Sequence, residues 1–119
     1  MFDIIAFIDD GVDVMAREKF QTLTEQMYYI LLCLREEHCG ADIAEIVRTW
    51  TEGKVLIGPG TMYGLLDDFQ KEGLIKLTKT EGRRRSYVIT EKGKSMLDAE
   101  YQRLLRLTMD FDRLRPKEV

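Results

Sequence analysis

The chain has 119 residues, of which 45% are hydrophobic and 33% are charged, and its formal net charge is −3. This composition is typical of one soluble globular domain and excludes an intrinsically disordered chain. The acidic balance argues against a generally basic nucleic-acid coat, but it does not exclude a local basic patch. The two cysteines imply no disulfide framework, so a reducing cytoplasm is the simplest compartment.

The first 21 residues form an N-terminal extension without a clear pattern. Residues 1–8 are mostly apolar, but Asp3 interrupts the run, and Asp9 and Asp10 end it. The run lacks a basic leader and is too short for a bilayer, so we expect neither a signal peptide nor a membrane span. A strand, a short helix that packs on a dimer and a disordered tail all stay open for this segment.

Two amphipathic helices are predicted next. Thr22 and Glu25 have the spacing of a capping box at the start of an apolar helix that contains Ile30 and Leu34. The second helix is predicted over Asp42–Trp50. Its apolar residues have the spacing of one buried face, and they are Ile43, Ile46, Val47 and Trp50. We therefore interpret Trp50 and the tyrosines as core residues, the alternative being an effector pocket at a dimer interface.

A third helix is predicted within Gly58 to Ile75, which reads GPGTMYGLLDDFQKEGLI. Gly58 as N-cap and Pro59 at the first helical position predict its start, and Gly73 predicts its end. Its apolar face consists of Met62, Leu65, Leu66 and Phe69. The N-terminal part of the opposite face is small and polar, and it consists of Gly60, Thr61, Tyr63 and Gly64. Such a helix start has unpaired N–H donors and partial positive charge, which suit phosphate.

A β-hairpin is predicted over residues 74–89, because two short runs of alternating apolar and polar residues flank a polar turn at Gly82. Its tip and outgoing strand contain Arg83, Arg84 and Arg85. Positive charge gathers here, since residues 71–92 contain seven basic and three acidic side chains, whereas residues 1–57 contain five basic and eleven acidic ones.

Thr90 is predicted to cap a long final helix over residues 91–115. Apolar positions in this helix alternate in steps of four and three, and the resulting seam is Leu97, Tyr101, Leu104, Thr108 and Phe111. A seam of this length exceeds what a small core needs. It therefore indicates association of two helices, which we interpret as a homodimer interface.

The order of three short helices, a basic hairpin and a long helix predicts an α+β, mostly helical fold. It is a winged helix-turn-helix over residues 22–90 with a C-terminal dimerisation helix over residues 91–115. In that motif the third helix lies in the DNA major groove and the hairpin reaches the neighbouring backbone or minor groove. The residues that we expect to contact double-stranded DNA are Gly60, Thr61, Tyr63, Gly64, Arg83, Arg84 and Arg85.

From Leu23 to Phe111 the sequence also resembles the PadR-like transcriptional regulators. The resemblance rests on LTEQMYYILLCL, GPGTMYGLLDDFQKEGLI and EGRRRSYVITEKGKSML. It implies a cytoplasmic homodimeric repressor of a pseudo-palindromic operator, with Thr61 and Tyr63 facing DNA and Arg83 to Arg85 in the wing. Many such regulators release DNA when a small molecule binds, and whether an effector acts here stays open.

The sequence departs from the family pattern in two places. Ala41 replaces a tyrosine that relatives often have, which puts any contact from that position in doubt. Asp67 and Asp68 stand where relatives often carry a basic residue, so we expect them to face away from phosphate or to weaken binding.

An enzyme is not expected, because the lone His38 excludes histidine clusters, and Cys33, His38 and Cys39 lack the spacing of zinc ligands. No cofactor, metal or membrane is expected as a partner. The alternative that stays open is a winged helix used for protein–protein contact without DNA binding.

Overall fold

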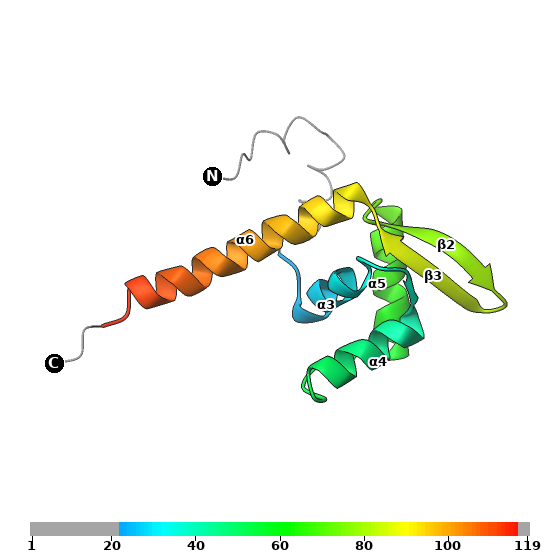
Figure 1. Ribbon diagram of the computed structural model, residues 1–119, viewed down its shortest axis with the longest axis horizontal. Coiled ribbons are helices and arrows are strands. Elements are labelled where there is room, and N and C mark those ends of the chain that lie inside the picture. Colours follow the sequence, from blue (N-terminus) through cyan, green and yellow to red (C-terminus); the bar gives the residue numbers. More distant parts are fainter. Residues whose placement is uncertain (1–21, 117–119) are drawn as a thin grey trace.

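The computed structural model describes residues 22–116, so the N-terminal extension predicted for residues 1–21 lies outside the described residues. The elements follow in the order α3 (Glu25–Cys33), β1 (His38–Cys39), α4 (Gly40–Trp50), α5 (Pro59–Lys71), β2 (Ile75–Glu81), β3 (Arg84–Ile89) and α6 (Glu91–Arg113) (Figure 1). Among the described helices, none is both long and apolar enough to cross a membrane.

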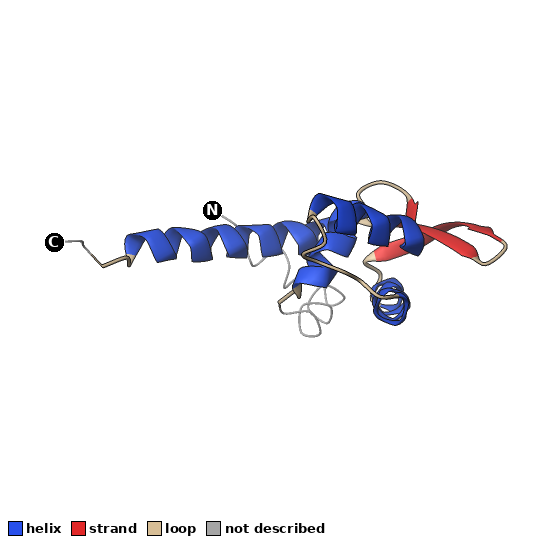
Figure 2. Cartoon of the chain, turned by 90° about the horizontal axis from the view of Figure 1, so that it is seen from below, coloured by secondary structure: helices blue, strands red, loops and turns tan. Residues whose placement is uncertain are grey.

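One core lies between α3, α4, α5 and the base of the sheet. Most of the apolar positions predicted for these helices lie in it, and the largest fully buried side chains are Phe69, Ile30, Leu31, Leu34, Ile43, Leu66, Leu74, Ile75 and Val47. The first turns of α6 close the core with Met96 and Leu97. Glu100 is the last buried residue of α6. The C-terminal part of this helix extends from the body as an arm, and the β2–β3 hairpin, here called the wing, projects at the opposite end (Figures 1 and 2).

The sheet has three antiparallel strands in the order β1-β3-β2. Strands β2 and β3 pair from Ile75 opposite Ile89 to Glu81 opposite Arg84, with a register shift between Leu77 and Lys79. The short strand β1 pairs His38 with Tyr87 and adds a third strand to the base of the wing. The sequence did not predict β1, because two residues are too few to show the alternation of a strand.

Local signals set most helix ends where they were predicted. Gly58 is the N-cap of α5 and Pro59 is its first residue. Gly73, with a φ of +75°, adopts the left-handed conformation just beyond the C-cap of α5. Thr90 caps α6, and its Oγ1 accepts a hydrogen bond from the Gly93 backbone N–H at 3.1 Å.

The predicted capping box at Thr22 is wrong. The N-cap of α3 is Thr24, whose Oγ1 accepts a hydrogen bond from the Met27 N–H at 3.2 Å. Helix α3 starts later than predicted because Leu23 is buried and its N–H donates to Glu100 on α6. Leu23, directly before the N-cap, is therefore held by a tertiary contact.

The prediction that Trp50 lies in the core is also wrong, because its side chain is 80% exposed. Trp50 is the last residue of α4, one turn beyond the last buried residue, Val47. No described element covers α4 at that point. Trp50 instead forms one wall of a surface groove of 540 Å³ between α3 and α4, with Tyr29 and Ile46 among the other lining residues.

A buried carboxylate joins α6 to the start of the winged domain. Glu100 is only 5% exposed, and its Oε2 accepts a hydrogen bond from the Leu23 N–H at 3.2 Å. Arg103 donates two further hydrogen bonds to this carboxylate, at 2.8 and 2.6 Å. The bonds from Arg103 outweigh the opposing effect of burial, and with the bond from Leu23 they lower the pKa of Glu100 below its ordinary value.

Glu100→Gln is expected to lower the free energy of unfolding by about 2 kcal/mol at neutral pH, because a buried charge-assisted contact is lost. Because the folded pKa is lowered, the carboxylate stabilises the fold fully above its unfolded pKa of about 4.3, and this contribution disappears as pH falls through the folded pKa. Urea unfolding of both proteins from about pH 7 to about pH 3 should therefore give a shrinking difference. A difference that stays constant over this range would contradict the assignment.

Candidate nucleic-acid interface

The outward face of α5 begins with two glycines that the packing of the chain does not require. Gly60 and Gly64 are exposed, and a Cβ atom on either would meet no other atom within 4 Å. Glycine inside a helix costs about 1 kcal/mol relative to alanine. These two glycines, with the exposed Thr61 beside them, therefore form a surface that another molecule can approach closely.

A groove of 840 Å³ separates α5 from the wing. On the α5 side it is lined by Tyr63, Asp67 and Gln70. The other side consists of residues 82–85 of the wing and residues 39–42 at the start of α4. The structure thus brings Tyr63, which is 68% exposed, and the three predicted arginines to one concave surface. The three other predicted residues on α5 do not line this groove but lie on the exposed surface of the same helix.

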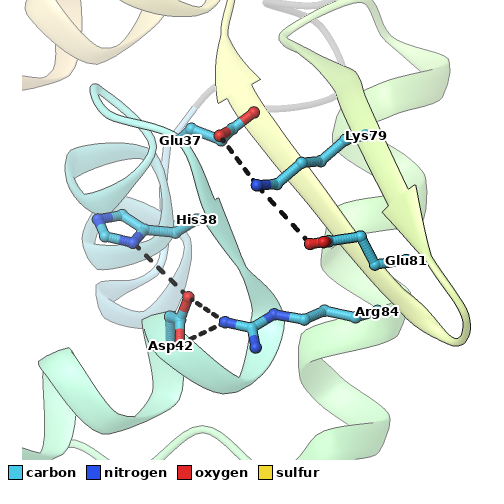
Figure 3. A network of polar contacts seen from close by, with 6 residues as sticks. All are labelled: Glu37, His38, Asp42, Lys79, Glu81 and Arg84. Carbon is cyan, nitrogen blue, oxygen red and sulfur yellow. Dashed lines mark hydrogen bonds and ion pairs between the residues drawn. The ribbon is translucent and has the colours of Figure 1, made fainter.

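The three wing arginines are not equivalent, although the sequence presents them as one cluster. Arg84 donates two hydrogen bonds from one guanidinium nitrogen to the carboxylate of Asp42, at 3.0 and 3.2 Å (Figure 3). Within residues 22–116, the side chains of Arg83 and Arg85 make no hydrogen bond or ion pair. Arg83 and Arg85 are therefore the two whose charge is available to an incoming anion.

Asp42 is a residue of this surface that the sequence did not single out. Partial burial opposes its charged form, but hydrogen bonds from Cys39 and Arg84 outweigh that effect and lower the pKa of Asp42. The same contact raises the pKa of Arg84. No sequence signal pairs these residues, because they lie 42 positions apart.

Asp67 does not face away from the candidate interface, which leaves the second expectation for it, that it weakens binding to phosphate. It lines the groove, and its carboxylate lies 2.9 Å from the ammonium group of Lys71, one helical turn later. Both side chains are more than half exposed, so water screens their attraction. Asp67 therefore places negative charge, partly offset by Lys71, beside Tyr63. Asp68 is half-buried.

Comparison with known proteins identifies the family. The model of the transcriptional regulator PadR-like family matches residues 30–99, which include α4, α5, the wing and the start of α6. The chain belongs to this family. Both the family and the winged-helix fold that the sequence predicted are thereby confirmed.

The individual PadR-like relatives share low sequence identity with this chain. Transcriptional regulator YqjI of Escherichia coli (strain K12) is 28% identical over 64 residues, which are 54% of this chain and 31% of YqjI, so the chain spans less than a third of this curated relative. A PadR-family regulator from Eggerthella lenta DSM 2243 has 21% identity and a TM-score of 0.67, over 93% of this chain and 97% of the other. Bacillus subtilis PadR, solved in complex with operator DNA, has 20% identity and a TM-score of 0.57, over 82% of this chain and 51% of the other.

The seam predicted along the last helix of this PadR-like chain is only partly available to another molecule. Leu97 is 7% exposed and belongs to the core of its own chain. Leu104 is half-buried, and Tyr101, Thr108 and Phe111 are exposed. These last four residues are called the exposed seam below. Further exposed apolar side chains on the arm are Leu105, Leu107, Met109 and Leu114.

The described residues include one histidine and two cysteines, and neither cysteine is fully exposed. Within the described residues, no group of three or more histidine, cysteine or acidic side chains is placed to hold a metal ion. Burial raises the pKa of the half-buried Cys33 thiol, which makes its reactive thiolate scarcer. Cys39 is buried.

Proposed function

We propose that this PadR-like chain binds double-stranded DNA through α5 and the wing, and that it acts in the cytoplasm as a homodimeric repressor. The observation that carries the proposal is the shared concave surface of Tyr63 with Arg83 and Arg85, beside a helix start whose glycines are open to close approach. The complex of Bacillus subtilis PadR with operator DNA supports it from a protein of similar fold.

In this proposal α5 enters the major groove with its N-terminus first. Its unpaired backbone N–H groups and the Thr61 and Tyr63 hydroxyls hydrogen-bond to phosphates and base edges. Gly60 and Gly64 allow the helix backbone to come close to the DNA. Arg83 and Arg85 neutralise backbone phosphates next to the groove. The Asp67 carboxylate repels phosphate and so weakens binding, an effect that Lys71 partly offsets.

The homodimer is proposed because the exposed seam would otherwise leave large apolar side chains in water. Two recognition helices would then enter successive major grooves about 34 Å apart, and the operator would be pseudo-palindromic. Release of DNA by a small-molecule effector also belongs to the proposal. A groove of 590 Å³ between α3 and α6, with Tyr28 and Tyr101 on its walls, supports this part.

Selection of bound duplexes from a random DNA pool tests the proposed function. We expect enrichment of two inverted half-sites about one helical turn apart, and an affinity that falls steeply with salt because counterions are released. No enrichment and no binding at low salt would refute the DNA-binding proposal. That outcome would favour the alternative, a winged helix used for contact with another protein.

Phe111→Glu is expected to convert the dimer to a monomer, because it places a charge within the exposed seam of both copies. Phe111 is 68% exposed within one chain, so the protomer should remain folded. Arg106→Glu is the control, since Arg106 is exposed on the same helix but lies on the side opposite the seam. Sedimentation velocity measures the result, and a Phe111→Glu dimer as tight as the parent would refute the seam.

A further inference from the structure

Polar contacts hold the wing to the first turn of α4 (Figure 3). Arg84 is the first residue of β3, and its guanidinium contacts both carboxylate oxygens of Asp42. His38 Nδ1 lies 3.9 Å from the same carboxylate. Asp42 is the third residue of α4, so its side chain extends from the first turn of that helix. Asp42 therefore presents an acceptor for the wing at the start of α4.

A second contact involves the other strand of the wing. Lys79 lies on β2, directly after the register shift, and its Nζ is 3.9 Å from a carboxylate oxygen of Glu37 and 3.7 Å from one of Glu81 (Figure 3). Strands β2 and β3 thus each make an ion pair with a residue close to β1, Glu37 before it and Asp42 after it. The Arg84 contact lies nearer the wing tip than the pairing of Cys39 with Ser86, which ends the β1 ladder, whereas Lys79 lies opposite Ser86.

We propose that Asp42 is a positioning residue for DNA binding, which holds the wing at a set angle to α5 through Arg84. Arg84 then serves this contact and does not neutralise a phosphate. The inference rests on the proposed DNA-binding function. Its physical basis is that β1 pairs only with Ser86 and Tyr87, whereas Arg83 lies beyond them towards the wing tip. A wing held in place loses less conformational freedom when Arg83 and Arg85 meet DNA.

If only the number of charges mattered, loss of the Asp42 carboxylate would have the opposite effect on DNA affinity. Removing the Asp42 carboxylate would take negative charge from the groove and release Arg84 to a phosphate, so DNA binding would become tighter. If Asp42 positions the wing, its removal makes binding weaker. The side chains of Asp42 and Arg84 are 41% and 56% exposed, so their contact adds little to global stability, and the variants should fold.

The test measures affinity for the duplex that the parent protein enriches from a random pool, with the full chain as Asp42→Asn, Arg84→Ala and the double variant. Each single variant is expected to bind roughly two- to fivefold more weakly. The double variant should bind no more weakly than either single one, because both remove the same contact. Each variant should keep the salt dependence of the parent, because no phosphate contact is lost.

Asp67→Asn is the matched control. It removes a carboxylate from the same groove without touching the wing contact, so it should bind DNA more tightly. Asp42→Asn binding as tightly as the parent or tighter would overturn the inference. The inference would also be overturned if Arg84→Ala lowered the slope of log affinity against log salt by about 0.9 for each DNA-bound copy, because that decrease indicates a lost phosphate contact.

A second readout does not depend on DNA. Backbone amide relaxation by NMR should show faster motion at Gly82 and Arg83 in Asp42→Asn than in the parent, with unchanged order at core residues such as Phe69. Equal order in both proteins would refute the positioning role. If the parent binds no DNA at all, the proposed function fails, and this measurement still decides whether Asp42 orders the wing.

Discussion

Gly93→Ala is expected to destabilise the protein by about 3 kcal/mol, near the upper end of what overpacking costs. A Cβ atom at this position would overlap the backbone carbonyl oxygen of Leu74 and would lie 2.6 Å from Cγ1 of Ile89. The Leu74 carbonyl cannot turn away, because it already accepts a hydrogen bond from the Thr90 N–H at 3.0 Å. The first turn of α6 would have to shift off the base of the sheet, and chemical denaturation measures the cost.

Gly64→Ala provides the control, because it is the same exchange in the interior of α5 with open space around the new methyl group. It is expected to raise the free energy of unfolding by up to about 1 kcal/mol, since alanine favours the helix. Under the proposed function it also weakens DNA binding by obstructing close approach. Equal destabilisation by the two substitutions would show that α6 does not pack on Leu74 as described.

Replacing both Arg83 and Arg85 by alanine is expected to flatten the dependence of DNA affinity on salt. Each lost phosphate contact lowers the slope of log affinity against log salt by about 0.9, so two copies with two arginines each should lose about 3.6. A monomer on DNA should lose about half of that. The fold should be unaffected, since neither side chain has a hydrogen bond or ion pair within residues 22–116. Fluorescence anisotropy across a salt series gives the slope.

Arg106→Ala is the control for this experiment, because it removes an exposed positive charge from the arm, away from the wing. Its slope should stay close to that of the parent. An Arg83, Arg85 double variant with the parent's slope would mean that the wing does not reach phosphate. The proposed mode of DNA binding would then have to rely on α5 alone.

The sequence does not show which of the three wing arginines has a partner within the protein. The run of three arginines correctly predicted a basic hairpin tip, because charge and turn residues are local features. Which arginine is available to DNA depends on the partner that folding places beside it. Asp42 belongs to α4, whereas Arg84 belongs to the wing. The antiparallel pairing of β1 with β3 brings the start of α4 and the wing together.

The sequence by itself determined the order of the helices and the hairpin, the ends of α5, the start of α6 and the core faces of α3 and α5. Those features follow from short-range rules, such as the Gly58-Pro59 start of α5 and the buried face around Phe69. Tertiary structure alone decided the exposure of Trp50, the strand β1 and the burial of Glu100 against Leu23, which lies 77 positions away. Each depends on which elements cover a given face, and residue spacing within one element carries no information about that. The sequence alone predicted that the outward face of α5 contacts DNA, but only the tertiary structure places Tyr63 of that face in one groove with the wing.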